Sequence, residues 1–439
     1  MSQTISEYGT IRKASDFDLP EDSFSEIFVS DKTFFNLKLF AFSGANDLIF
    51  SYLTQHGKEQ IKVKNYVGLI QTADGTQIEI LPKSSENLPK EARKILLKML
   101  RVLPKSPYQT LSKTHLESSH LPLFEIFVNV FLDELKKLLS QGLGRNFESQ
   151  SSNEVFVKGK ILIAENIRQN SIQKARFFVN FDEFLEDIPQ NRILKVCLQW
   201  LYNQSGCVPQ FTNGRCSAKT KQRILQYLPV FDEVNNSINI QVDFAKSNAK
   251  NRSFERYDNV LNWAKIFLNH QSFSPFSEKN HQLALLFPME VLFENYLGKA
   301  FKKYFPESYE ISLQDKAKHL IDRHLEFPKF RLIPDIVVRN HEKTFIFDTK
   351  WKLLNATKAN QNYGIEQSDL YQMYAYGKKY HSKQLFLIYP ANSHFKTPLI
   401  FDYDEGMTLQ VLPFDLGNDV ENEMQEIKRL FSISTNDRL

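Results

Sequence analysis

The chain has 439 residues, of which 42% are hydrophobic and 24% are charged, and its formal net charge is +4. The length is too great for one ordinary core, so two or three domains are expected, and the composition is that of a globular protein. There is no long apolar run and no apolar signal region at the polar N-terminus, which argues against a membrane span and a secretory leader. The weak positive charge permits nucleic-acid binding through local patches without requiring it.

The chain contains Cys197, Cys207 and Cys216. An odd number of cysteines without a C-x-x-C pair argues against a disulfide framework and against a zinc ribbon. We therefore expect a reduced protein that works in the cytoplasm.

The first 280 residues are predicted to form an α+β region. In chain order it is β-rich over residues 20–85, helical over 88–145 and mixed over 150–270. The pair Asp74-Gly75 between two apolar runs predicts a β-hairpin in the β-rich part.

The mixed part begins with a predicted strand over residues 153–168. Apolar residues at helical spacing then predict three helices, over residues 190–203, 218–228 and 259–270. The polar stretch 271–282 is interpreted as the linker into a last domain over residues 281–439.

The most informative stretch of this last domain contains two predicted strands, Leu332–Val338 and Thr344–Trp351, joined by a polar turn. If Arg339 pairs with the first residue of the second strand, Asp335 lies opposite Asp348. Opposed residues of an antiparallel pair have Cβ atoms about 5 Å apart. Two carboxylates at that spacing are able to share one divalent cation.

Lys350 lies on the same face as Asp348, because side chains alternate along a strand, whereas Thr349 points to the other face. A lysine beside a carboxylate-held Mg²⁺ is suited to hold the attacking water and to offset developing charge. The alternative is that each aspartate occupies an edge or solvated position of an ordinary strand.

The spacing of Pro334-Asp335 and Asp348-Thr349-Lys350 resembles the signature of the PD-(D/E)xK nuclease superfamily. The resemblance implies an α/β nuclease domain with a Mg²⁺ site and a helix ahead of the hairpin that contributes a glutamate. That helix is predicted over Phe287–Phe305, where Glu294 is the favoured third acidic ligand. Glu290 is the alternative ligand. The third interpretation is that the glutamate lies on the helix surface and binds no metal.

After the hairpin, a helix is predicted over Ser368–Tyr380 and a central strand over Gln384–Tyr389. Gln372 and Tyr376 are one turn apart and share a face of that helix. Together with Lys352 they are candidate DNA contacts, although the tyrosine also fits a core position.

The whole chain resembles the McrC family, the nuclease subunits of McrBC-type modification-dependent restriction systems. Beyond the Asp335, Asp348 and Lys350 set, the likeness is carried by ordered segments: Tyr66–Leu69, Ile78–Lys83, Gly159–Asn166, Asn191–Leu194 and Phe293–Leu297.

This resemblance implies a partner, McrB, which is a AAA+ GTPase ring that reads methylated cytosine. It also implies that the N-terminal region docks on the ring, enters its pore and stimulates nucleotide hydrolysis, while the C-terminal domain cuts double-stranded DNA. The sequence agrees in having no G-x-x-x-x-G-K-[ST] loop, so a motor must come from another chain. A basic residue near Lys158 or Arg168 is a candidate for stimulating it.

Two other functions remain open at this stage. The chain could be a non-catalytic adaptor that activates a AAA+ ring, or a stand-alone DNA-repair nuclease. The intact Asp335, Asp348 and Lys350 argue against the adaptor, and the long front region is unexplained by the stand-alone nuclease.

Overall fold

The computed structural model describes residues 2–42, 48–83, 88–204, 217–247, 252–268, 283–340 and 343–433. Cys207, Cys216, the predicted linker 271–282 and the predicted domain boundary at residue 280 lie outside these ranges. No helix within the described ranges is long and apolar enough to cross a membrane.

The chain divides into two compact units. The first combines Met1–Leu123 with Ser272–Leu439, and the second is Phe124–Gln271. The first unit is therefore made from both ends of the sequence.

The front part of the first unit contains two β-sheets. One has the strand order β3-β2-β5-β4 and the other β1-β7-β6-β11. The bounds are β1 Ser2–Ser6, β2 Thr10–Lys13, β3 Glu26–Val29, β4 Phe50–Gln55, β5 Lys58–Val63, β6 Tyr66–Gln71, β7 Gln77–Leu81 and β11 Leu283–Pro288. The predicted hairpin at Asp74-Gly75 is confirmed, because β6 and β7 are antiparallel partners.

A helix, α1 (Asp31–Phe42), lies within the region predicted to consist mostly of short strands, so that prediction was wrong there. The hydroxyl of Ser30 accepts a hydrogen bond from the backbone N–H of Thr33 and satisfies a free donor of the first turn. Phe34 and Leu37 are buried three residues apart, as a helix requires. Phenylalanine has a high strand propensity, which favoured strands in the prediction. The buried residues of this segment are nevertheless spaced as on one face of a helix.

Pairing between β6 and β11 connects the front sheet to the C-terminal part of the unit. Gly68 of β6 has φ +135°, and a Cβ atom there would lie 1.9 Å from the backbone oxygen of Leu285. Only glycine allows the two backbones to approach this closely.

One buried ion pair holds helix α2 (Pro89–Leu100) against the front sheet. The guanidinium of Arg93 donates to the carboxylate of Glu79 on β7 at 2.5 Å, and both side chains are buried. A short helix, α3 (Lys113–Glu117), follows.

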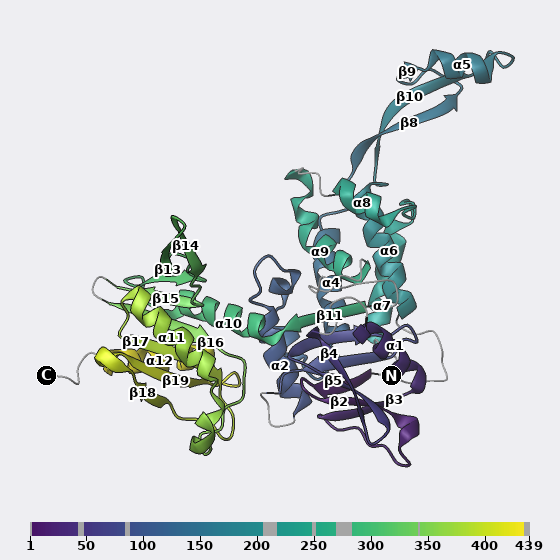
Figure 1. Cartoon of the computed structure of the whole chain (residues 1–439). Coiled ribbons are helices and arrows are strands. Elements are labelled where there is room, and N and C mark those ends of the chain that lie inside the picture. Colours follow the sequence, from purple (N-terminus) through teal and green to yellow (C-terminus); the bar gives the residue numbers. More distant parts are fainter. Residues whose placement is uncertain are drawn as a thin grey trace. The chain divides into compact units, whose positions relative to one another are not determined.

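The second unit is a helical body that carries a long β-arm (Figure 1). A long helix, α4, lies in the region predicted to be helical over 88–145. The helices predicted over 190–203, 218–228 and, within the described residues, 259–270 are confirmed, and a shorter helix, α8, lies before the last of them. The bounds are α4 Leu123–Leu139, α6 Pro189–Gln204, α7 Ala218–Tyr227, α8 Ile240–Ser247 and α9 Asp258–Leu268. Aromatic contacts fill the space between them, as between Phe127 and Trp263 at 5.7 Å.

The β-arm consists of β8 (Asn146–Glu154) antiparallel to β10 (Phe177–Leu185), with β9 (Lys160–Ile161) and α5 (Ile163–Asn170) at its far end (Figure 1). The predicted strand over 153–168 was therefore wrong for most of its length, because only residues 153–154 and 160–161 lie in strands. The run of alternating apolar residues there is short, and the spacing of Ile163 and Ile167 also fits one helix face.

The C-terminal part of the first unit is a mixed α/β layer structure with strand order β12-β15-β16-β17-β19-β18. Strands β16, β17 and β19 are parallel, and the other neighbours are antiparallel. The bounds are β12 Glu310–Leu313, β15 Ile336–Arg339, β16 Thr344–Thr349, β17 Gln384–Pro390, β18 Leu399–Asp402 and β19 Thr408–Phe414. A separate hairpin contains β13 (His319–His324) and β14 (Phe327–Arg331).

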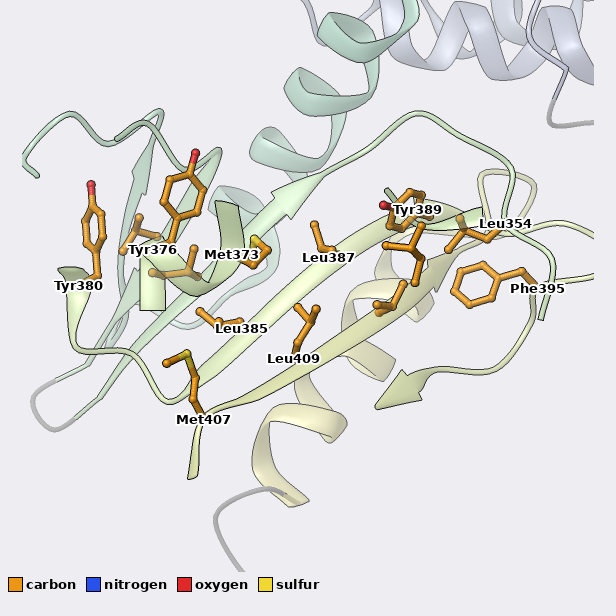
Figure 2. Close-up of a cluster of buried hydrophobic side chains, with 14 residues drawn as sticks. Leu354, Met373, Tyr376, Tyr380, Leu385, Leu387, Tyr389, Phe395, Met407 and Leu409 are labelled. Carbon is orange, nitrogen blue, oxygen red and sulfur yellow. The ribbon is translucent and has the colours of Figure 1, made fainter. Parts of the chain in front are cut away.

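Helices cover both faces of this sheet. On one face, α10 (Met289–Tyr304) and α12 (Val420–Ile433) pack, and Phe301 meets Phe347 at 4.8 Å. On the other face, α11 (Gln367–Tyr380) contributes Met373, Tyr376 and other residues to a buried cluster over the strands (Figure 2).

Three predicted bounds are corrected by the structure. The first hairpin strand begins at Ile336, because Pro334 has no N–H to pair and the N–H of Leu332 bonds to Lys318 instead. The second ends at Thr349. The helix predicted from Phe287 begins two residues later, because Phe287 is paired in β11.

Replacing Gly68 with alanine is expected to destabilise the protein by more than about 2 kcal/mol, because the new methyl group collides with a backbone oxygen that cannot move without breaking the β6–β11 pairing. The free energy of unfolding in urea measures the loss. Gly57→Ala is the control: Gly57 also has positive φ but has open space around its Cβ position, so only about 1 kcal/mol is expected. Equal losses for the two variants would contradict this account.

Candidate functional site

The candidate site residues Asp335, Asp348 and Lys350 lie at the end of the β15–β16 hairpin. Arg339 pairs with Thr344 and Ile336 with Phe347, so the predicted register is confirmed. One step further along this register, Asp335 comes opposite Asp348. Asp335 itself lies in the bend that precedes β15.

Two hydrogen bonds fix the carboxylate of Asp335. Its Oδ2 accepts from the backbone N–H of Thr349 at 2.7 Å and from the hydroxyl of Thr349 at 2.6 Å. Sequence reasoning assigned Thr349 no role, because alternation turns it away from Asp348. The bend ahead of β15 nevertheless brings Asp335 to it, and no periodic signal marks such a bend.

The buried carboxylate of Asp348 forms an ion pair with the half-buried Lys350. Asp348 is 2% exposed, and the Nζ of Lys350 lies 2.8 Å from its Oδ2. The same ammonium lies 3.4 Å from Asp369 of α11 and donates to the Oε1 of Gln372 at 3.0 Å. Asp369 was not predicted as a site residue, although it is one turn before Gln372 on the same helix.

Gln372 and Tyr376 form one hydrogen-bonded chain with Lys350. The amide nitrogen of Gln372 donates to the hydroxyl of Tyr376 at 2.6 Å, which in turn donates to the backbone oxygen of Ile333 at 3.1 Å. The ring of Tyr376 is buried in the cluster of Figure 2, so it is a core residue whose polar end reaches the site.

The two glutamates of α10 have different surroundings. Glu294 accepts from Gln314 at 2.8 Å, and its charge acts on Asp335. Glu290 accepts from Asn65 of the front sheet at 2.5 Å, and its charge acts on Glu7. Of the two, Glu294 is therefore the one that the structure brings to the aspartates.

The charged groups at the hairpin shift one another's pKa values. Burial, and then the neighbouring carboxylate of Glu294, raise the pKa of Asp335. Burial, and then the charge of Asp335, raise the pKa of Asp348 in the same way. Although burial lowers the pKa of Lys350, the carboxylates of Asp348 and Asp369 raise it above its usual range. Lys350 therefore remains a cation at neutral pH.

The residues fit a magnesium ion that would take only some of its oxygen ligands from the protein and the others from water and substrate. Within the described ranges, no group of three or more His, Cys, Asp or Glu side chains forms a ready-made cage. Mg²⁺, however, is commonly held by one or two carboxylates together with water and phosphate oxygens. The half-buried Asp335 and the buried Asp348 supply two carboxylates whose repulsion a divalent cation would relieve.

A residue near the N-terminus also contacts the segment that carries Lys350. The indole N–H of Trp351, one residue after Lys350, donates to both carboxylate oxygens of Glu7 at 2.9 and 3.0 Å. Lys352 next to it pairs with Glu366 at 3.0 Å at an exposed position. Nothing in the spacing of the sequence signals the contact of Glu7 with Trp351.

Comparisons with known proteins agree with the predicted resemblance. The family model described as "McrBC 5-methylcytosine restriction system component" matches residues 61–390. A solved structure titled as a half-complex of Thermococcus gammatolerans McrB AAA+ hexamers with bound McrC is similar, with a TM-score of 0.69 and 16% identity over 97% of this chain and 100% of that chain. A cryo-EM structure of the McrBC complex from the same organism covers 70% of this chain and 89% of that chain at 18% identity and a TM-score of 0.49. The comparison with curated proteins finds no match.

Without divalent ions, the melting temperature is expected to fall as the pH rises from about 5 to about 8. The folded protein holds Asp335 and Asp348 with raised pKa values, about 6 and about 7, so their stabilising contribution is full near pH 4 and is lost as the pH passes those values. Asp348→Asn should show a smaller fall, measured by calorimetry across this range. Part of the fall should persist, because burial also raises the pKa of Glu7 to about 7.

Asp402→Asn is the matched control, since Asp402 is an exposed residue of β18 in the same part of the unit. It should keep the pH dependence of the parent protein. A fall in Asp348→Asn as large as in the parent would contradict the assigned repulsion.

Proposed function

The chain belongs to the McrBC 5-methylcytosine restriction system component family, and on this premise we propose that it is the DNA-cleaving subunit of such a restriction complex. In this function it hydrolyses phosphodiester bonds of double-stranded DNA with Mg²⁺, through a PD-(D/E)xK-type nuclease domain. It works in the cytoplasm with a AAA+ partner, as the resemblance to McrC implies.

The observation that carries the proposal is the ion pair between the buried Asp348 and the half-buried Lys350, with the half-buried Asp335 placed opposite Asp348 by the hairpin register. Withdrawing two carboxylates and a cation from water is costly unless they serve each other or a ligand. Titratable groups with strongly raised pKa values are characteristic of catalytic sites.

Asp335 and Asp348 would hold the magnesium ion, with Glu294 as the third acidic group. When bound, the metal lowers the pKa of a water and neutralises charge on the phosphate. Lys350 remains protonated and so offsets negative charge that develops on the attacked phosphate.

Gln372 and Tyr376 act on Lys350 and not on the reaction directly. Gln372 accepts from the Nζ of Lys350 and donates to Tyr376, which is anchored to the backbone of Ile333. This chain of hydrogen bonds restricts the ammonium to one position. The arrangement favours a positioning role over the DNA contact that the sequence suggested.

The AAA+ partner would dock on the β-arm of the second unit. The far end of the arm and its helix α5 expose large apolar side chains: Phe156 at 65%, Ile163 at 70% and Ile167 at 65%. Exposed apolar residues that gather in this way mark interaction surfaces. The similar Thermococcus gammatolerans structure is titled as McrB AAA+ hexamers with bound McrC, which supports a partner of that class. In this proposal the partner is a GTPase that reads methylated cytosine.

The two basic residues singled out from the sequence both lie on the arm. Lys158 lies 3.8 Å from the ring centroid of Phe181 and 3.7 Å from Glu183. Arg168 lies in the last turn of α5 and is exposed. Because the side chain of Lys158 is already engaged within the arm, Arg168 is the better placed to reach a partner.

Asp348→Asn should abolish Mg²⁺-dependent cleavage, and Lys350→Ala should reduce it by about 10² to 10³-fold, since each removes charge from the reacting centre. Cleavage of methylated plasmid DNA by the complex with the AAA+ partner measures both. Stimulation of the partner's nucleotide hydrolysis should remain, which separates the nuclease from the docking function. Undiminished cleavage by Asp348→Asn would refute the site and leave the adaptor function as the better account.

Replacing Ile163 and Ile167 together with serine should reduce stimulation of the partner's nucleotide hydrolysis by about tenfold, because a few buried apolar anchors provide most of the affinity of an interface. Phosphate release by the mixed proteins measures this. Leu225→Ser on α7, an exposed leucine elsewhere in the second unit, is the control and should change nothing. Full stimulation by the double variant would show that docking uses another surface.

A further inference from the structure

A cavity of about 480 Å³ lies directly beside Lys350. One side is lined by the catalytic segment, with Lys350, Trp351 and Lys352, and another by the start of the chain, with Tyr8 and Lys83. These residues belong to the same compact unit. The volume is within the range of cavities that bind small ligands, about 300–1,000 Å³.

Tyr8 is held in a strained conformation at this cavity. Its φ is +60°, in the left-handed region that bulky residues rarely adopt, and 45% of its surface is exposed. The neighbouring backbone fixes this conformation, because the N–H of Glu7 bonds to Leu81 at 2.9 Å and the N–H of Gly9 to Ser6 at 3.0 Å. Strain of this kind is concentrated at ligand-binding sites. An exposed aromatic ring is thus fixed at the wall of the cavity.

Basic side chains line the same cavity as the ring. Lys83 and Lys352 are exposed cavity residues, in addition to the half-buried Lys350. Four carboxylates also line the cavity, and each has a partner within the protein. Glu7 accepts from Trp351, Glu290 accepts from Asn65, Glu366 pairs with Lys352, and Asp369 pairs with Lys350. An aromatic surface with lysines at its border is the arrangement that binds a nucleic-acid strand by stacking and phosphate contact.

We propose that this cavity binds one nucleotide of the DNA strand adjacent to the bond being cut. Its base stacks on Tyr8, and its phosphate lies between Lys83 and Lys352. This proposal rests on the proposed nuclease function, because it places the scissile phosphate at Lys350. It makes the first residues of the chain part of the DNA site as well as part of the front sheet.

The test uses the full chain carrying Asp348→Asn, so that DNA is bound in Mg²⁺ without being cut. The probe is a duplex with 2-aminopurine scanned along one strand, whose fluorescence is quenched by stacking. Tyr8→Asn removes the ring but tolerates the positive φ, whereas Tyr8→Phe keeps the ring. Lys83→Gln removes one cation. Its control is Lys62→Gln, because Lys62 is an exposed lysine of β5.

Tyr8→Asn should weaken DNA binding by about tenfold and abolish quenching at one probe position. Tyr8→Phe should stay within about twofold of the parent. Lys83→Gln should weaken binding and lower the slope of log Kd against log salt by about one, while Lys62→Gln leaves both unchanged. Equal behaviour of Tyr8→Asn and the parent, or equal losses in Tyr8→Asn and Tyr8→Phe, would overturn the subsite.

Cleavage of the same duplex by the chain with Asp348 intact, together with its AAA+ partner, distinguishes the two proposals. If that complex cleaves while Tyr8→Asn binds normally, the subsite alone is overturned. If it does not cleave although Tyr8→Asn loses binding, the nuclease function is overturned, and the cavity is supported as a nucleotide-binding site but not as one beside a bond being cut. A parent protein that fails to bind DNA overturns both.

Discussion

The site depends on the paired hydrogen bonds by which Thr349 holds Asp335. They tie the bend before β15 to the end of β16, so Asp335 and Asp348 remain close although their charges repel. The β16–β17 pairing supports this end of the strand from the other side, and the N–H of Lys350 bonds to Ile388 at 2.9 Å. A preorganised pair of carboxylates is what the coordination of a hard cation requires.

Two connections join the front sheet to the C-terminal α/β layers near Asp335 and Asp348. Strand β11 pairs with β6 and continues directly into α10, which carries Glu294. The buried carboxylate of Glu7 holds the indole of Trp351, whose ring also packs against Phe293 of α10 at 5.3 Å. The segment that carries Asp348 and Lys350 is thus supported by residues of the N-terminal region.

The sequence allowed the hairpin register and helices α10 and α11 to be predicted, because strand alternation, loop length and helical spacing are local and periodic. Thr349 and Asp369 were missed, since their roles arise from a bend and from packing between elements. Glu7 lies 344 residues from Trp351, and a single sequence contains no signal for such a contact. The helix α5 was missed because its eight residues are too few to distinguish it from a strand.

The electrostatics of the site bear on how its activity is controlled. Burial raises the pKa of both Asp335 and Asp348, so ionising them without a cation costs free energy at neutral pH. In the proposed function, binding of a divalent ion and of a DNA phosphate would offset that cost, and each would stabilise the arrangement that accepts the other. Such a site would be completed by its substrate. The proposal therefore implies that delivery of DNA by a partner limits cleavage and that the isolated chain cuts weakly.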